Sequence, residues 1–214
     1  MRTTAALLTL LCLGTAAASS MELKLDRRAI EEAIAIGQSP LERDRVRFHE
    51  PYRLLVARPP IDYIDVVTPF RRVVLAAENR ARLGDRRFGQ AEALKLLDAA
   101  SPQLGVYVEL TFHPLNTYVG VPDYRVKLIS AAGAATEPLT SDRVPRFGPR
   151  LAGSPLPYPG PPPTLPGRTL PMLGGTVVTV FDGSLIDPNG SYLAAISETA
   201  KELARVKVDL GRLR

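Results

Sequence analysis

The feature that most constrains the fold is the regular alternation of residue types over 104–113. Every second residue from 106 to 112 is apolar, and the residues between them, such as Tyr107 and Glu109, are polar or amphipathic. Successive side chains of a strand point to opposite faces of a sheet, so one face of this segment is buried and the other is wetter. Further strands are predicted at 124–128, 176–181, 192–197 and 203–210, with the last two joined by a turn near Thr199 and Ala200.

Helices are predicted before this segment. Asp26 is a residue type that caps helices, and the short helix after it is expected to end at Gly37. Thr68 and Pro69 are the types preferred at the N-cap and first position of a longer helix, which Gly84 ends. The alternative is that the paired valines within 72–75 continue a strand. We favour the helix because the apolar residues recur at helical spacing.

The remaining N-terminal segments carry weaker signals. A short helix is predicted at 90–97, with Ala93, Leu94 and Leu97 facing inward. Short strands are expected at 52–57 and 61–67, on either side of Pro59 and Pro60. The polar segment 43–47 is expected to be irregular.

A proline-rich segment interrupts the strands. Ten of the twenty prolines of the chain lie within 145–171. Because proline lacks an amide donor and has a fixed φ, we do not expect regular sheet or helix here. We expect locally extended polyproline II instead.

The segment DPNGSY, from Asp187 to Tyr192, precedes the predicted strand at 192–197. A turn of this composition that leads into a tyrosine resembles the tyrosine corner of immunoglobulin-like sandwiches, in which the hydroxyl bonds to backbone upstream. The resemblance covers about the last 30 residues. Together with the helices and strands predicted above, it leads us to expect an α+β protein: a mixed helical and short-strand region at 21–102, packed on an immunoglobulin-like antiparallel β-sandwich at 103–214. The chain lacks the cysteine pair and the tryptophan of antibody domains.

The first twenty residues have the order of a secretory signal peptide. Arg2 is followed by an apolar run over 5–13 and by small residues, including Ala18, that suit cleavage. The run is shorter than the ~20 residues that a membrane span needs, and the alternative is a buried N-terminal helix. We expect a periplasmic or secreted protein without disulfides, because the single cysteine, Cys12, lies in the leader. Twenty-two arginines against five lysines indicate a GC-rich bacterial genome.

Several chemistries are disfavoured by the composition. The net charge of +5 is spread along the chain without a basic stripe, which argues against nucleic-acid binding. His49 and His113 are the only histidines and lack metal-ligand spacing. No serine nucleophile motif or phosphate loop is present, so no cofactor and no catalytic residue is predicted. Glycoside hydrolysis would need a carboxylate pair, and the acidic residues considered for it are Asp62 and Asp65 with Glu78 or Glu109.

Arg71 and Arg72 stand out because basic residues at a helix N-terminus oppose the helix dipole. One interpretation is an anion-binding site near free helix amides. The other, which we favour, is ion pairing with Asp62, Asp65 or Glu78.

Two functional hypotheses follow. The first is a non-catalytic envelope or secreted protein that binds a partner protein, an anionic wall polymer or a small ligand. The second is an envelope hydrolase that uses His113 or the carboxylates. The mature chain is expected to have no integral membrane segment.

Overall fold

The computed structural model describes residues 21–98, 101–113, 115–148 and 170–214. The predicted leader at 1–20 and most of the proline-rich segment, 149–169, lie outside the described residues. The structure has both helices and antiparallel sheets. The helices are α1 (Arg27–Gly37), α2 (Glu42–His49), α3 (Pro69–Arg82) and α4 (Gln90–Leu97). The strands are β1 (Arg53–Arg58), β2 (Ile61–Val67), β3 (Gln103–Thr111), β4 (Tyr124–Ser130), β5 (Ala135–Thr136), β6 (Thr140–Phe147), β7 (Met172–Asp182), β8 (Ser191–Glu198) and β9 (Lys201–Asp209).

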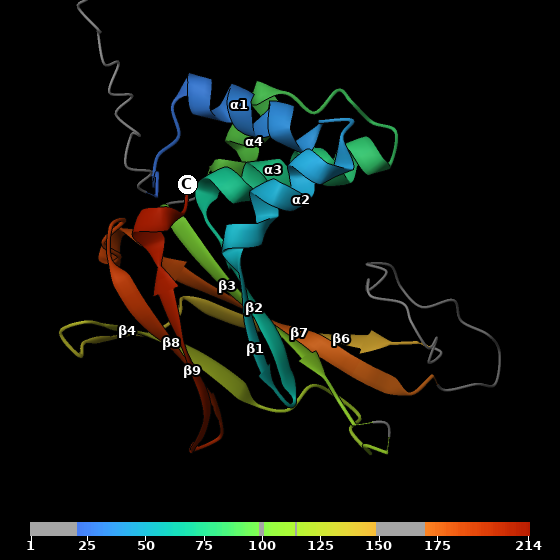
Figure 1. The fold of residues 1–214 in the computed structure, drawn as a ribbon, viewed down its shortest axis with the longest axis vertical. Helices are drawn as coiled ribbons and strands as arrows, with labels where there is room; N and C mark the ends of the chain where they lie inside the picture. Colours follow the sequence, from blue (N-terminus) through green and yellow to red (C-terminus); the bar gives the residue numbers. More distant parts are fainter. Residues whose placement is uncertain (1–20, 99–100, 114, 149–169) are drawn as a thin grey trace, which may run out of the picture.

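The strands form two antiparallel sheets. The first has the order β1-β2-β3-β7-β6 and the second β5-β4-β8-β9. The edge strands β1 and β9 lie beside one another, which brings the two sheets together on that side. Figure 1 shows the four helices gathered at one end of the sheets. Because β1 and β2 pair into the same sheet as β3, the expected boundary at residue 102/103 falls inside a sheet.

The sandwich core is built from the apolar faces that the alternation predicts. Val106, Val108 and Leu110 of β3 are fully buried, and the inner residues of β4 and β8 pack against them in one cluster. Tyr192 at the start of β8 is also buried, and its hydroxyl accepts a hydrogen bond of 2.8 Å from the Asp187 amide. This bond closes the turn between Asp187 and the start of β8.

A second apolar cluster joins α1, α3 and α4, with Ile30, Phe70 and Val74 among its buried residues. The predicted caps hold this unit: the Asp26 side chain accepts from the Ala29 amide, and the Thr68 side chain accepts from the Arg71 amide. The helix over 72–75 is confirmed, and the strand alternative is wrong. Gly37 lets α1 approach α3 closely, because a Cβ there would lie 2.4 Å from the Val74 carbonyl oxygen.

Two local predictions for the helical region were wrong. Segment 43–47 is not irregular but lies in α2, where Glu42 and Asp44 in the first turn and Arg47 and His49 in the last turn complement the helix dipole. Leu94 does not face inward, because its side of α4 borders a surface pocket and it is 51% exposed.

The prediction that the proline-rich segment 145–171 contains no regular sheet was wrong at its start. Pro145 lies within β6, and that strand continues to Phe147. The reason is that β6 is an edge strand, in which a missing amide donor is tolerated on the open side.

Within the described ranges, no helix is both long and apolar enough to cross a membrane.

Candidate functional site

Arg71 lies in the first turn of α3 and points into the junction between the helices and the first sheet. Its side chain is 2% exposed. The guanidinium lies 3.1 Å from an Asp65 carboxylate oxygen, donates to the Val66 carbonyl oxygen at 2.7 Å, and sits over the Tyr52 ring. Burial lowers the pKa of Arg71, and the charge of Asp65 opposes that effect. The buried cation is therefore fully engaged by the protein itself.

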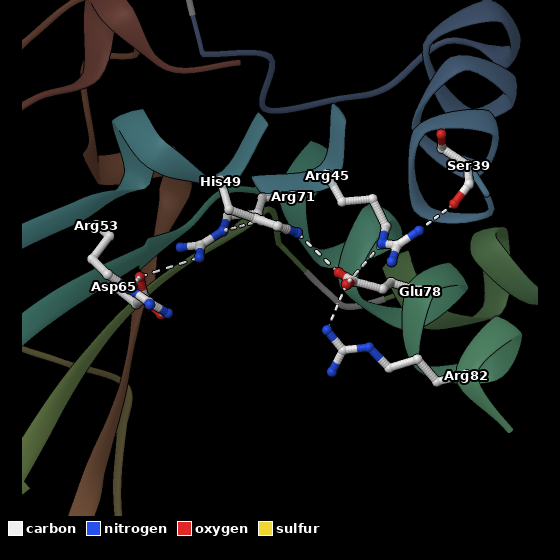
Figure 2. A network of polar contacts seen from close by, with 8 residues as sticks. All are labelled: Ser39, Arg45, His49, Arg53, Asp65, Arg71, Glu78 and Arg82. Atoms are coloured by element: carbon white, nitrogen blue, oxygen red, sulfur yellow. Dashed lines mark hydrogen bonds and ion pairs between the residues drawn. The ribbon is translucent and has the colours of Figure 1, made fainter. Parts of the chain in front are cut away.

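His49, at the end of α2, lies between Arg71 and Glu78 (Figure 2). Its Nδ1 accepts from the Arg71 Nε at 3.3 Å, and its Nε2 lies 2.9 Å from a Glu78 carboxylate oxygen. A guanidinium has donors only, so the Nδ1 lone pair is occupied and the proton of the neutral ring is on Nε2. The His–Glu pair has no free nitrogen with which to accept a proton from a substrate.

Glu78 of α3 is the centre of the second half of this network. It is buried and contacts Arg82 at 2.7 Å and Arg45 at 3.3 Å. The hydrogen bond from His49 is the largest of the effects that hold the pKa of Glu78 below its ordinary value. Arg45 also donates to the Ser39 carbonyl oxygen and so ties the network to the end of α1.

The two arginines singled out by the sequence do not converge. Arg72 points away from Arg71 and donates to the Gln103 side chain at 2.8 Å. Arg71 makes the ion pair with Asp65 that we favoured from the sequence. An anion site shared by both guanidinium groups is therefore absent from the described part of the molecule.

Arg72 instead lines a surface pocket of about 560 Å³ between the segment before α1, α4 and the start of β3. The pocket has three cationic side chains, Lys24, Arg72 and Lys95, and one acidic side chain, Asp98. Among the described residues, none of the three cations has a carboxylate within ion-pair distance. Its apolar wall is formed by Leu23, Leu25, Pro69, Leu94, Leu97 and Pro102.

Three of the candidate carboxylates, Asp62, Asp65 and Glu109, lie on the adjacent strands β2 and β3, and each is engaged by neighbouring side chains. Asp65 pairs with Arg53 and Arg71, and Asp62 accepts from the Thr111 hydroxyl. Glu109 is buried and accepts from the Thr176 hydroxyl at 2.7 Å; its burial raises the pKa of this carboxyl. In the ranges that the structure describes, no three His, Cys, Asp or Glu residues form a metal-binding group.

His113 is exposed, and its Nδ1 accepts from the Leu115 amide at 3.2 Å. It thus stabilises a turn after β3. Among the described residues, no hydrogen bond joins either histidine to a serine.

The sequence did not single out Lys24 and Lys95 as site residues. They lie 71 positions apart and border the same pocket only because α4 packs beside the segment that leads into α1. The helical spacing places Leu94, beside Lys95, in the core, whereas the structure exposes it at the edge of the pocket.

No protein-family model matches the chain, no curated protein matches its sequence, and no solved structure matches its fold.

Proposed function

We propose that this protein is an exported, non-catalytic binding protein that holds an anionic ligand with an apolar part. The observation that carries the proposal is the pocket lined by Lys24, Arg72 and Lys95, where positive charge stands beside a leucine-rich wall. A volume of about 560 Å³ is within the range of small-molecule sites. The ligand is either a small amphipathic anion or an anionic group of a wall polymer.

The charges at the pocket support an anion over a neutral ligand. Lys24 and Lys95 are exposed, and Arg72 is half-buried. The Gln103 side chain fixes the guanidinium of Arg72 without neutralising it. Asp98 compensates one of three positive charges, so an incoming anion meets a net attraction that salt would weaken.

The secretory leader predicted at 1–20 supports a site of action in the periplasm or outside the cell. The hydrolase alternative, centred on His113 or the carboxylates, is less favoured, since the Leu115 amide occupies Nδ1 of His113 and Asp65 is paired with Arg53 and Arg71.

We propose that the two sheets form an immunoglobulin-like sandwich. In that fold, strands A, B, E and D make one sheet and C, F and G the other, which C′ extends. If β2 is strand A and the others follow in chain order, the two sheets become A-B-E-D and C′-C-F-G, in agreement with the neighbours found here. Tyr192 at the start of β8 then has the position of a tyrosine corner. An experimental structure with orthogonal sheets would contradict this assignment.

The ligand hypothesis is tested by calorimetric titration of the purified protein with octyl phosphate, 1-octanol and inorganic phosphate. We expect octyl phosphate to bind most tightly, because it alone has both an anionic head and an apolar chain. The double substitution Arg72→Gln and Lys95→Gln should weaken its binding by about tenfold or more.

The matched control is Arg43→Gln with Arg125→Gln, which removes the same charge from exposed positions that do not line the pocket. If both double variants lost the same affinity for octyl phosphate, the loss would follow from the lower net charge alone, and the proposal would be contradicted. So would binding of 1-octanol as tight as that of octyl phosphate.

A further inference from the structure

Helix α2 is held to the rest of the molecule by few contacts. None of its eight residues is fully buried, and its N-cap residue Leu41 makes no side-chain capping bond. Phe48 is half-buried and packs against the rings of Tyr52 and Phe70. The remaining side-chain attachments are polar and involve Arg45 and His49. Segments with so little burial open at low free-energy cost.

The state of His49 is fixed by its two neighbours. Arg71 donates to Nδ1 from one side, and Glu78 accepts from Nε2 on the other. Both contacts are satisfied at once only when the imidazole is neutral with its proton on Nε2. Figure 2 shows the ring between the guanidinium and the carboxylate.

A second proton on the ring would remove one of these contacts. It would bind at Nδ1 and face the Arg71 N–H, so that two donors and two positive charges would meet over 3.3 Å. Arg71 has no room to withdraw, because it is 2% exposed and is held by Asp65 and the Val66 carbonyl oxygen. The side that moves is therefore His49, together with the end of α2.

The other charges around His49 do not reverse this expectation. Glu78 would attract a protonated ring, but its carboxylate is already shared by Arg45 and Arg82. Asp65, on β2, is shared by Arg71 and Arg53 of β1. The charged side chains of the network, namely Arg45, Arg53, Asp65, Arg71, Glu78 and Arg82, therefore hold four positive and two negative charges before His49 takes up a proton. The exposed Glu50 follows His49 in the chain.

We propose that His49 makes α2 a proton-sensitive latch, which is closed while the imidazole is neutral and opens when Nδ1 takes up a proton. Opening moves Phe48, which together with Tyr52 and Phe70 lines a pocket of about 710 Å³ beside α1 and α2. Mild acid thus exposes an aromatic surface. This inference is independent of the anionic ligand proposed above, because it concerns a different pocket.

The latch is tested by hydrogen exchange followed by mass spectrometry at pH 7.5 and pH 5.5, with rates corrected for the intrinsic effect of pH. We expect exchange in peptides covering α2 to rise about tenfold in acid, while α3 and β3 stay protected. The variant His49→Gln keeps a donor for Glu78 but cannot take up a proton, so the acid-induced increase should disappear. The control His113→Gln removes the other histidine and should keep the increase in full.

A second measurement on the unaltered protein does not depend on how a variant folds. Nitrogen chemical shifts of the His49 ring at pH 8 should identify the Nε2–H tautomer. A ring protonated on Nδ1 at that pH would overturn the proposal. An unchanged exchange rate of α2 between the two pH values, or a full acid response in His49→Gln, would overturn it as well.

Discussion

Glu109 is buried on the face of the first sheet that points away from the sandwich core, and its charge is poorly compensated. Thr176 donates to one carboxylate oxygen at 2.7 Å. The other oxygen lies 3.4 Å from an Arg146 nitrogen but has no hydrogen-bond donor among the described residues. Burial is the largest cause that raises the pKa of Glu109. A buried acceptor without a donor costs stability when the group is ionised.

This imbalance predicts that Glu109→Gln stabilises the protein at neutral pH. A raised pKa in the folded state means that the contribution of the carboxyl is fully present below its ordinary pKa and is lost as the pH rises through the folded value. The variant should therefore unfold at a higher temperature than the parent at pH 7.5 and at the same temperature near pH 4. Circular dichroism melts at both pH values measure the difference.

Glu92→Gln provides a control of opposite sign. Backbone hydrogen bonds, including that from the Gly89 amide, lower the pKa of Glu92, so its charge favours the folded state at neutral pH. Its substitution should not raise the melting temperature at pH 7.5. A Glu109→Gln protein that melts below the parent at pH 7.5 would refute the argument.

Single residues were predictable where the physical cause is local. The caps Asp26 and Thr68 depend on neighbours three positions away, and each makes the expected contact. Glu109 was expected on the wetter face of its strand. It is buried because of neighbours on β2, β6 and β7, which lie far away in the sequence.

The contact between α1 and α3 depends on a glycine. At Gly37, an added Cβ would lie 2.4 Å from the Val74 carbonyl oxygen and 2.7 Å from the Ala77 Cβ. Both neighbours belong to the rigid middle of α3, so the two helices would have to separate. We therefore predict that Gly37→Ala lowers the free energy of unfolding by about 1–3 kcal/mol in urea denaturation.

Gly120→Ala is the matched control, because no atom lies within 4 Å of the added Cβ and the residue has no unusual φ. Its free energy of unfolding should stay within about 0.5 kcal/mol of the parent. Equal stability of Gly37→Ala and Gly120→Ala would show that α1 adjusts freely.

Elements with an apolar period were predicted, and those without one were missed. α2 has no buried residue, so its segment looked irregular, although its end charges complement the helix dipole. β6 is exposed along nearly its whole length and contains Pro145. Its formation depends on the free edge of β7, which is a property of the sheet and not of the segment.

At the scale of the whole molecule, Arg71 connects the helical unit with the first sheet. It belongs to α3, and its contacts are Asp65 and Val66 on β2 and His49 on α2. Loss of the guanidinium leaves the Val66 carbonyl oxygen without this donor at a buried position. We predict that Arg71→Met lowers the free energy of unfolding by about 2–4 kcal/mol, as measured by chemical denaturation.

Arg72→Met removes the same charge from the next position, where one contact with Gln103 is lost. Its cost should stay below about 1 kcal/mol. If both variants lost the same stability, the junction would not depend on Arg71.

The divergence of these two arginines explains why the candidate site was only partly predictable. Neighbouring helical residues point about 100° apart, so Arg71 faces the sheet while Arg72 faces solvent beside the pocket. The two arginines in the first turn of α3 could be recognised as unusual from the sequence, because positive charge there opposes the helix dipole. The pocket itself also needs Lys24 and Lys95, which only the packing of α4 brings to it.

The place where the chain leaves and re-enters the first sheet has a wider consequence. Val67 at the end of β2 pairs with Gly105 of β3, so helices α3 and α4 form an excursion whose two ends lie on adjacent strands. A gap of about 4.8 Å can be closed by a two-residue turn. The connection between β2 and β3 is therefore far longer than the sheet pairing requires, and its extra length carries α3, whose contacts with α1, α2 and β2 bind the helical unit to the scaffold.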